Sequence, residues 1–146
     1  MYIKKIWAGT KIRVSGYKSE WSGEVEIIDA VFQILDGNYT AEPLDITEML
    51  SSEEELLAHQ NELVAAKGLT VKKVEYKNGE PGDDIYLTLA IGDAEYSFCV
   101  EVYLTGPDSD VYKTVGNLKE GDTVDVEGFL YWYEGANPHI TSITVK

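Results

Sequence analysis

Cysteine and histidine are nearly missing from this chain of 146 residues, and their scarcity removes several classes of chemistry. Cys99 is the only cysteine, so no internal disulfide can form, and the cysteine count does not fix the compartment. His59 and His139 are the only histidines, and no HExxH, P-loop, GxSxG or paired-cysteine motif occurs. We therefore expect no catalytic residues, no metal site and no cofactor, and hence a protein that is not an enzyme.

Basic residues are also few. Twelve bases oppose 26 acids, which gives a net charge of −14, and such a field repels phosphate backbones. Most of the bases lie in two groups, one before residue 19 and one between residues 67 and 77. The charge disfavours nucleic acid as a partner without excluding it.

Long apolar runs are absent as well. No segment approaches the roughly 20 apolar residues that cross a bilayer, so we expect no membrane span. The start MYIKKIW lacks the apolar run of a signal peptide. Two interpretations stay open: a cytoplasmic protein, or a piece of a longer extracytoplasmic protein that lacks its signal peptide.

What the chain does contain is typical of a β-rich domain. Ten tyrosines and three tryptophans favour pleated, half-buried surfaces. A chain of this length with 44% hydrophobic residues can bury an ordinary core without disulfides. Cys99 lies in YSFCVEVYL, where a buried small hydrophobic residue is expected rather than a reactive thiol.

Two segments of the chain resemble each other. Residues 9–28 and 121–140 align without a gap as G-x-x-[IV]-x-V-x-G-[YF]-x-x-x-[WY]-x-G-x-x-x-x-I. Each copy is expected to be a strand with an inner glycine, a turn and a returning strand. We interpret this as an internal repeat; the alternative is that two unrelated β-hairpins share alternation and a turn glycine.

The repeat predicts that the aromatic rings of the stretch GFLYWYEGANPHI (128–140) lie on two different faces of the hairpin. A β-bulge at the shared inner glycine, Gly128 in the second copy, would bring the valines before it and the shared rings after it onto one face. This predicts that Phe129 and Tyr133 lie in the core. Leu130 and Trp132 stand opposite polar residues of the first copy, so they are predicted to form an exposed contact for residues 1–45 or for a partner.

Three segments are predicted along the chain. Residues 1–45 form an N-terminal β-hairpin segment, residues 46–62 a helical connection, and residues 63–146 a barrel. Ser52 and Glu55 form a capping-box pattern that opens a helix of about two turns. Alternation after residue 63 indicates five strands: a three-stranded meander, a long connection and a hairpin. The predicted fold class is therefore all-β, a five-stranded Greek-key barrel with one short helix and an additional N-terminal β-hairpin.

The stretch LKEGDTVDVEGFLYWYEGANPHITSI carries a family resemblance. Leu118 is followed after a gap by Gly121 and Asp122, and then by the alternating valines Val124 and Val126. In this the region resembles the entry to the fourth strand of an OB-fold domain. No clear helix is visible between the third and fourth strands, which departs from the family pattern. With the first repeat copy as the last two strands of another unit, the chain resembles the serial OB-like domains of bacterial extracytoplasmic lipoproteins and secreted proteins.

The resemblance implies a ligand face on strands two and three, rimmed by the loops between strands one and two and between strands four and five. The candidate residues on that face are Tyr86, Thr88, Ser97, Glu101 and Tyr103. Asn137 and His139 are the candidates in the loop between strands four and five.

The predicted function is a non-catalytic binding or interaction module of a bacterial, extracytoplasmic protein, with a protein or a glycan as its partner. The first alternative is a single-stranded nucleic-acid-binding OB domain, which would need aromatic platforms and a cationic groove. The second alternative is a structural spacer without a ligand. Because one fold hosts many functions, the site must decide between them.

Overall fold

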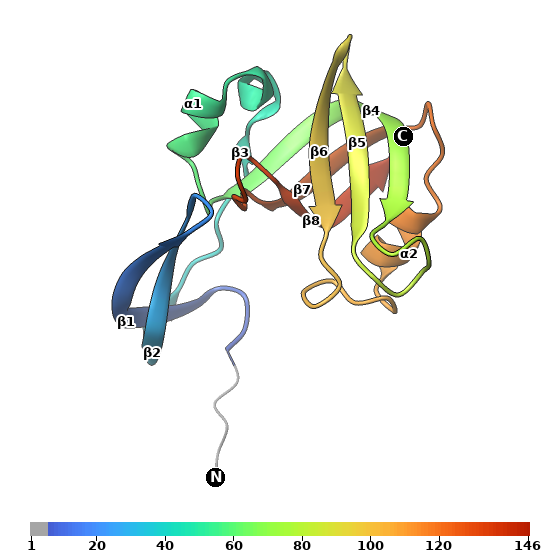
Figure 1. Cartoon of the computed structure of the whole chain (residues 1–146). Helices are drawn as coiled ribbons and strands as arrows, with labels where there is room; N and C mark the ends of the chain where they lie inside the picture. Colours follow the sequence, from blue (N-terminus) through green and yellow to red (C-terminus); the bar gives the residue numbers. More distant parts are fainter. Residues whose placement is uncertain (1–5) are drawn as a thin grey trace.

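The computed structural model describes residues 6–146 (Figure 1). The bases Lys4 and Lys5, and with them the start of the predicted 1–45 hairpin segment, lie outside the described residues. The described chain consists of a β-barrel with short helical connections and a two-stranded hairpin that projects away from it (Figure 1). Within the described part of the chain, no helix has the length and apolar content needed to cross a membrane.

Five strands form the barrel in the spatial order β4-β5-β6-β8-β7, and a β4–β7 pairing closes it. All of these pairings are antiparallel except the short parallel contact of Cys99 with His139 between β6 and β8. This closed Greek key is the OB-fold arrangement, so the predicted fold class is confirmed. The strands are β4 (Leu63–Tyr76), β5 (Ile85–Ile91), β6 (Ala94–Val100), β7 (Thr123–Phe129) and β8 (His139–Val145).

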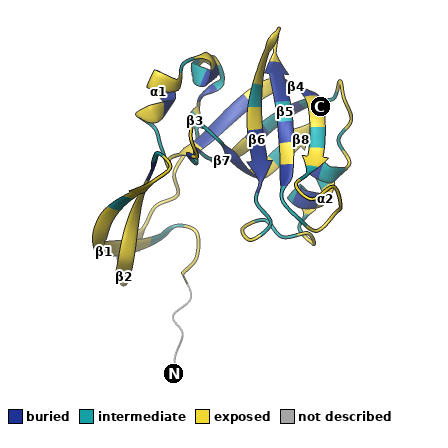
Figure 2. Ribbon diagram, in the orientation of Figure 1, coloured by how far each residue is buried: buried dark blue, intermediate teal, exposed yellow. Residues whose placement is uncertain are grey.

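Alternation along these strands places the core. In β5 the side chains of Ile85, Leu87 and Leu89 are fully buried, while Tyr86 between them is exposed. Side chains that alternate across a strand point to opposite faces, so every second residue enters the barrel. Phe98 and Val100 of β6 and Val124 and Val126 of β7 belong to the same core, and Figure 2 shows the buried strands of the barrel in dark blue.

Helix α2 (Asp110–Gly116) lies between β6 and β7, where no helix was predicted. Its first turn is capped because the Ser109 hydroxyl accepts a hydrogen bond from Tyr112 N at 3.1 Å. Tyr112 and Val115 are its buried residues, and the Tyr112 hydroxyl accepts from Gly82 N at 2.9 Å and donates to Asp83 O. Seven residues with two buried positions are too short to give a helical period in the sequence.

The segment between the hairpin and the barrel contains β3 (Leu44–Asp45), the 3₁₀ turn η1 (Thr47–Ser51) and helix α1 (Glu53–Leu57). β3 runs parallel to β4, with Leu44 beside Val64. Ser52 accepts a hydrogen bond from Glu55 N at 3.3 Å, so the predicted helix start is confirmed. The helix is shorter than the two turns predicted.

The N-terminal hairpin consists of β1 (Thr10–Trp21) and β2 (Glu24–Asn38), which pair only with each other in the described chain. Most of its residues are exposed on both faces, as the yellow ribbon in Figure 2 shows. In residues 6–146, the hydrogen bonds that join the hairpin to the β7–β8 connection and to the α1 segment lie at its turn.

Hydrogen bonds attach this turn to the β7–β8 connection and to the end of the α1 segment. The buried Glu24 carboxylate accepts from Trp132 N at 2.9 Å, and Glu134 N donates to Ser22 O at 2.7 Å. The Gln60 amide bonds both Gly23 O, at 2.9 Å, and Val25 N, at 2.7 Å, and Asn61 Nδ2 donates to Val25 O at 2.9 Å. A buried carboxylate that keeps a backbone partner avoids a large desolvation cost, so this contact holds the turn in one position.

The predicted bulge occurs beside the inner glycine of each hairpin, as expected, but its extra residue lies on the returning strand and not on the strand that carries the glycine. Pairing shifts between Ser15 and Tyr17 in the first hairpin and between Glu127 and Gly128 in the second. In both hairpins the extra residue belongs to the returning strand, β2 or β8, so the first strand keeps its alternation.

Because of this alternation, the prediction for the rings of residues 128–140 is wrong. Even-numbered side chains continue on the core side, where Leu130 is fully buried and Trp132 is 8% exposed. Phe129 and Tyr133, which were predicted in the core, turn to the opposite side; Phe129 is half-buried and Tyr133 is exposed. The Trp132 ring nevertheless lies against Gly23, so it contacts the N-terminal segment from a buried position.

Candidate functional site

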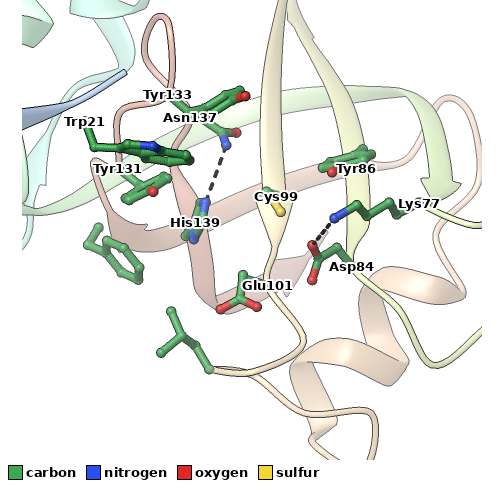
Figure 3. Close-up of a pocket in the computed structure, with 12 residues that line it drawn as sticks. Trp21, Lys77, Asp84, Tyr86, Cys99, Glu101, Tyr131, Tyr133, Asn137 and His139 are labelled. Atoms are coloured by element: carbon green, nitrogen blue, oxygen red, sulfur yellow. Dashed lines mark hydrogen bonds and ion pairs between the residues drawn. The ribbon is translucent and has the colours of Figure 1, made fainter. Parts of the chain in front are cut away.

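A pocket of about 590 Å³ opens on the outer face of β5 and β6 (Figure 3). Lys77 and Asp84 of the β4–β5 connection lie on one side, and the β7–β8 connection lies on the other. Trp21, at the turn of the N-terminal hairpin, adds a ring beside the β7–β8 connection. Strands two and three with these two loops are the usual ligand face of an OB barrel, so the pocket lies where the resemblance implies a site.

Aromatic rings form one wall of the pocket. The Trp21 and Tyr133 rings lie 5.2 Å apart at a tilt of 43°, and Trp21 is 54% exposed. The centroid of the Tyr131 ring lies 4.6 Å from that of His139 and 6.4 Å from that of Phe129. Rings in tilted and edge contacts hold one another in place and leave faces on which a planar ligand can stack.

Charged groups occupy the opposite side. Lys77 Nζ lies 3.8 Å from Asp84 Oδ2, and Asp84 Oδ1 accepts a hydrogen bond from Val102 N at 2.8 Å. Tyr86 and then Asp84 raise the pKa of the Lys77 ammonium above its ordinary value, so Lys77 is protonated at neutral pH. Glu101 adds a second carboxylate, positioned by a hydrogen bond from Tyr103 N at 2.9 Å. Lys77 is the one cation that lines the pocket in the described residues, against two carboxylates.

Burial keeps the remaining groups neutral. It lowers the pKa of His139 to about 4, raises that of the Cys99 thiol to about 12, and raises the pKa values of Tyr86 and Tyr131. Cys99 is thus a buried, unreactive thiol, as predicted.

His139 has an unusual environment for a neutral imidazole. Its Nδ1 is buried without a hydrogen-bond partner in the described chain, and its Nε2 lies 3.4 Å from Asn137 Nδ2. Its ring also contacts Phe129 at 5.1 Å. No group of three or more His, Cys, Asp or Glu side chains within residues 6–146 is arranged to hold a metal ion.

The structure brings together some of the predicted site residues and separates others. Tyr86, Glu101, Asn137 and His139 all line the pocket. Thr88 and Ser97 are cross-strand partners farther along β5 and β6 and do not reach it. Tyr103 is 93% exposed beyond the end of β6, and it does not line the pocket either. The buried pair Leu130 and Trp132 belongs to the core rather than to an exposed contact.

Several pocket residues escaped the sequence analysis. Tyr131 and Tyr133 could have been found by continuing the alternation of β7 through Gly128 without a face change. Trp21 could not, because its position depends on how a hairpin more than 100 residues earlier in the chain docks on the β7–β8 connection. Lys77 and Asp84 flank a turn whose geometry alternation does not describe.

Comparisons with known proteins support the fold. No protein-family model matches the chain, and no curated protein matches its sequence. Its structure is similar to an aspartyl-tRNA synthetase from Entamoeba histolytica, with a TM-score of 0.50 and 19% identity over 73% of this chain and 25% of that one. It is also similar to a protein from Leishmania major Friedlin described as an aspartyl-tRNA synthetase, with a TM-score of 0.52 and 16% identity over 76% of this chain and 22% of that one.

A third similar structure is the asparaginyl-tRNA synthetase from Pyrococcus horikoshii, with a TM-score of 0.46 and 18% identity over 60% of this chain and 20% of that one. The chain spans a quarter or less of the length of these proteins. The barrel topology and the loop-bounded pocket define the class: this is an OB-fold domain with an added N-terminal hairpin.

Proposed function

We propose that this OB-fold domain binds single-stranded nucleic acid by stacking one or two bases in the aromatic pocket. The observation that carries the proposal is the set of exposed rings on the OB ligand face, with Trp21 and Tyr133 on one side and Tyr86 on the other. Base–aromatic stacking contributes about 1–3 kcal/mol per base and tolerates any sequence. Single-stranded nucleic-acid binding is the first alternative function that the sequence predicts.

Polar groups beside the rings can hold the edges of a base. Asn137 offers an amide, Glu101 a carboxylate and Tyr86 a neutral hydroxyl. Lys77 is the group that can contact a phosphate. Since each phosphate contact on a single strand contributes a slope of about −0.7 to the salt dependence, one such contact gives a shallow slope.

The net charge of −14 limits how such a ligand binds. A long strand would bring many phosphates into a repulsive field, whereas a short segment would bring few. Affinity should therefore come from the rings, and it should depend little on salt. The similar solved structures with TM-scores of 0.50 and 0.52 are synthetases whose names include tRNA, which is consistent with the proposal.

The test is a titration of labelled dT and rU hexamers, followed by fluorescence anisotropy at two salt concentrations. Replacing Tyr86 and Tyr133 together by alanine should weaken binding about 10- to 100-fold, because each 1.4 kcal/mol of lost stacking is tenfold in Kd. Tyr103→Ala is the matched control, since Tyr103 is a tyrosine of the same domain outside the pocket. Absence of binding, or equal losses in the control and the double variant, would refute the proposal.

A neutral glycan is the second candidate, favoured by the two carboxylates that face the single Lys77 cation in the pocket. Aromatic faces with carboxylate and amide acceptors can hold a sugar without phosphate repulsion, and OB-folds bind oligosaccharides on the same face. Competition separates the two candidates: neutral oligosaccharides that displace the hexamers, or that bind where hexamers do not, would favour the glycan.

We further propose that the domain acts by binding and not by catalysis, because its pocket holds one cation, two carboxylates and a neutral His139 without a recognisable nucleophile–base pair. The bacterial, extracytoplasmic origin stays a prediction from the sequence resemblance.

A further inference from the structure

The acidic charge of the chain is concentrated outside the N-terminal hairpin. Residues 39–146 hold 21 acids against seven bases, a net charge of −14, whereas residues 10–38 hold five acids against three bases, a net charge of −2. The hairpin projects away from the barrel (Figure 1). A polyanion that leaves the pocket therefore meets less repulsion along the hairpin than along the barrel.

All three bases of the hairpin lie on β1, and alternation divides them between its two faces. Lys11 and Arg13 lie on the odd-numbered face, whereas Lys18 shares the even-numbered face with the acid Glu20. β1 keeps its alternation throughout, because the extra residues at both of its pairing irregularities belong to β2. Both faces expose apolar side chains, so what distinguishes the odd-numbered face is its pair of cations.

The odd-numbered face of β1 continues the aromatic wall of the pocket. Trp21 lines the pocket from the end of this face. Tyr17, four residues earlier on the same face, is 70% exposed. Since a strand advances about 3.3 Å per residue, Tyr17 lies roughly 13 Å and Arg13 roughly 26 Å from Trp21 along the strand. We call the row formed by Trp21, Tyr17, Arg13 and Lys11 the hairpin track.

The track faces the pocket at its turn end. Glu26 is the cross-strand partner of Ser19, so it lies on the same side of the hairpin as Trp21. Burial first, and then the charges of Glu24 and Glu26, raise the pKa of Tyr131, which lines the pocket. The acid on this side of the hairpin thus lies near the pocket, and the two cations lie farther out.

The cations of the track are available to an anion. Within residues 6–146, no ion pair joins Lys11 or Arg13 to a carboxylate. Asp29 and Asp36 lie at the pairing irregularities of β2, where neither has a partner on β1. A guanidinium can bind a phosphate through two parallel N–H groups, and the exposed Tyr17 ring can stack a base. Rings followed by cations are what a single strand needs beyond the pocket.

We propose that a single-stranded nucleic acid whose bases stack in the pocket continues along the hairpin track, with one base on Tyr17 and phosphates on Arg13 and Lys11. The proposal rests on the proposed function and adds a path for the rest of the strand. Along this path the flanking phosphates follow β1, whose three bases oppose one acid, instead of crossing the acidic barrel. A duplex is not the occupant, because its paired bases are not free to stack on the rings.

The test compares labelled rU trimers and dodecamers by fluorescence anisotropy at two salt concentrations. A trimer with its bases in the pocket is too short to reach Arg13, so its one phosphate contact, through Lys77, gives a slope of about −0.7. A dodecamer adds two contacts, for a slope of about −2.1. Between about 50 and 200 mM salt, affinity should fall about 3-fold for the trimer and about 18-fold for the dodecamer. The slope is the readout, because a longer strand also gains affinity by binding in more registers.

Substitutions on the two faces of β1 assign the added contacts. Replacing Lys11 and Arg13 together by glutamine should return the dodecamer to a slope of about −0.7. Lys18→Gln is the matched control, because it removes a cation from the other face of the same strand. Tyr17→Ala should weaken dodecamer binding about 5-fold or more, whereas Phe32→Ala, which removes an exposed ring from the opposite face, should not.

The outcomes for the hairpin track and for the pocket can be told apart. Equal slopes for trimer and dodecamer, or equal slope changes from Lys18→Gln and from either Lys11→Gln or Arg13→Gln alone, overturn the track. Trimer binding that depends on Tyr86 and Tyr133 would still support the pocket. If neither oligomer binds, both proposals are overturned. Trimer affinity checks the fold of each variant; if the double variant loses it, the single variants decide, each with about half of the slope change.

Discussion

Replacing Trp132 by alanine should cost about 3–5 kcal/mol of unfolding free energy, the range for large aromatic residues removed from a core. Trp132 is 8% exposed and belongs to the barrel core. A buried tryptophan removes about 150–250 Å² from water, and at about 25 cal/mol per Å² this corresponds to about 4–6 kcal/mol against an extended chain. The remaining Cβ and the compactness of the denatured chain reduce this upper estimate.

The measurement is urea denaturation of the whole chain, followed by far-UV circular dichroism so that the signal does not depend on the tryptophan itself. Tyr103→Ala is the control, because Tyr103 is 93% exposed and surface substitutions usually change stability by about 0.5 kcal/mol or less. If Trp132→Ala cost no more than this control, the alternation that places Trp132 in the core would be wrong. The same variant should also speed amide exchange in the hairpin turn, because the Trp132 ring lies against Gly23.

Three further predictions follow from the same structure. Gly128→Ala should lose about 1–3 kcal/mol of stability in the same assay, because the new Cβ would lie 1.7 Å from His139 O, whereas Gly106→Ala, with its nearest atom at 3.8 Å, should be close to neutral. Burial lowers the pKa of His139 from 6.5 to about 4, so between these pH values the folded state binds fewer protons than the unfolded state. The stability that comes from keeping His139 neutral is complete above pH 6.5 and is lost as the pH falls toward 4, by at most about 3 kcal/mol. His139→Gln should remove that part of the pH dependence of stability. Glu101→Gln should tighten binding of the rU hexamer severalfold by removing a pocket carboxylate, and an unchanged or weaker affinity would contradict phosphate repulsion as the limiting factor.

The sequence was sufficient for the barrel because alternation and turn glycines are local signals. Leu87 and Leu89 entered the core as predicted, and the Ser52 cap opened α1. The face of residues 129–133 was predicted wrongly for one reason: the sequence located the bulge at Gly128 but could not tell which of the two strands carries the extra residue. One residue of register changes the face of every side chain that follows.

The candidate site was predicted in part for a related reason. Tyr86 and Glu101 follow from the outer face of β5 and the end of β6, which alternation determines. Trp21 and Lys77 come from segments that only the tertiary fold brings to that face. A pocket built largely from connections has no local signature, because each connection contributes only a few side chains whose separation along the chain is set by the fold.

The attachment of the hairpin turn to the barrel makes the pocket and the hairpin energetically dependent on each other. Trp21 lines the pocket from a turn that hydrogen bonds of Glu24 and Ser22 attach to the β7–β8 connection. A ligand that stacks on Trp21 therefore stabilises the docked turn, and by thermodynamic linkage anything that steadies the hairpin raises affinity for the ligand by the same factor. A contact made on the hairpin away from its turn would then act as an effector of a pocket that it does not touch.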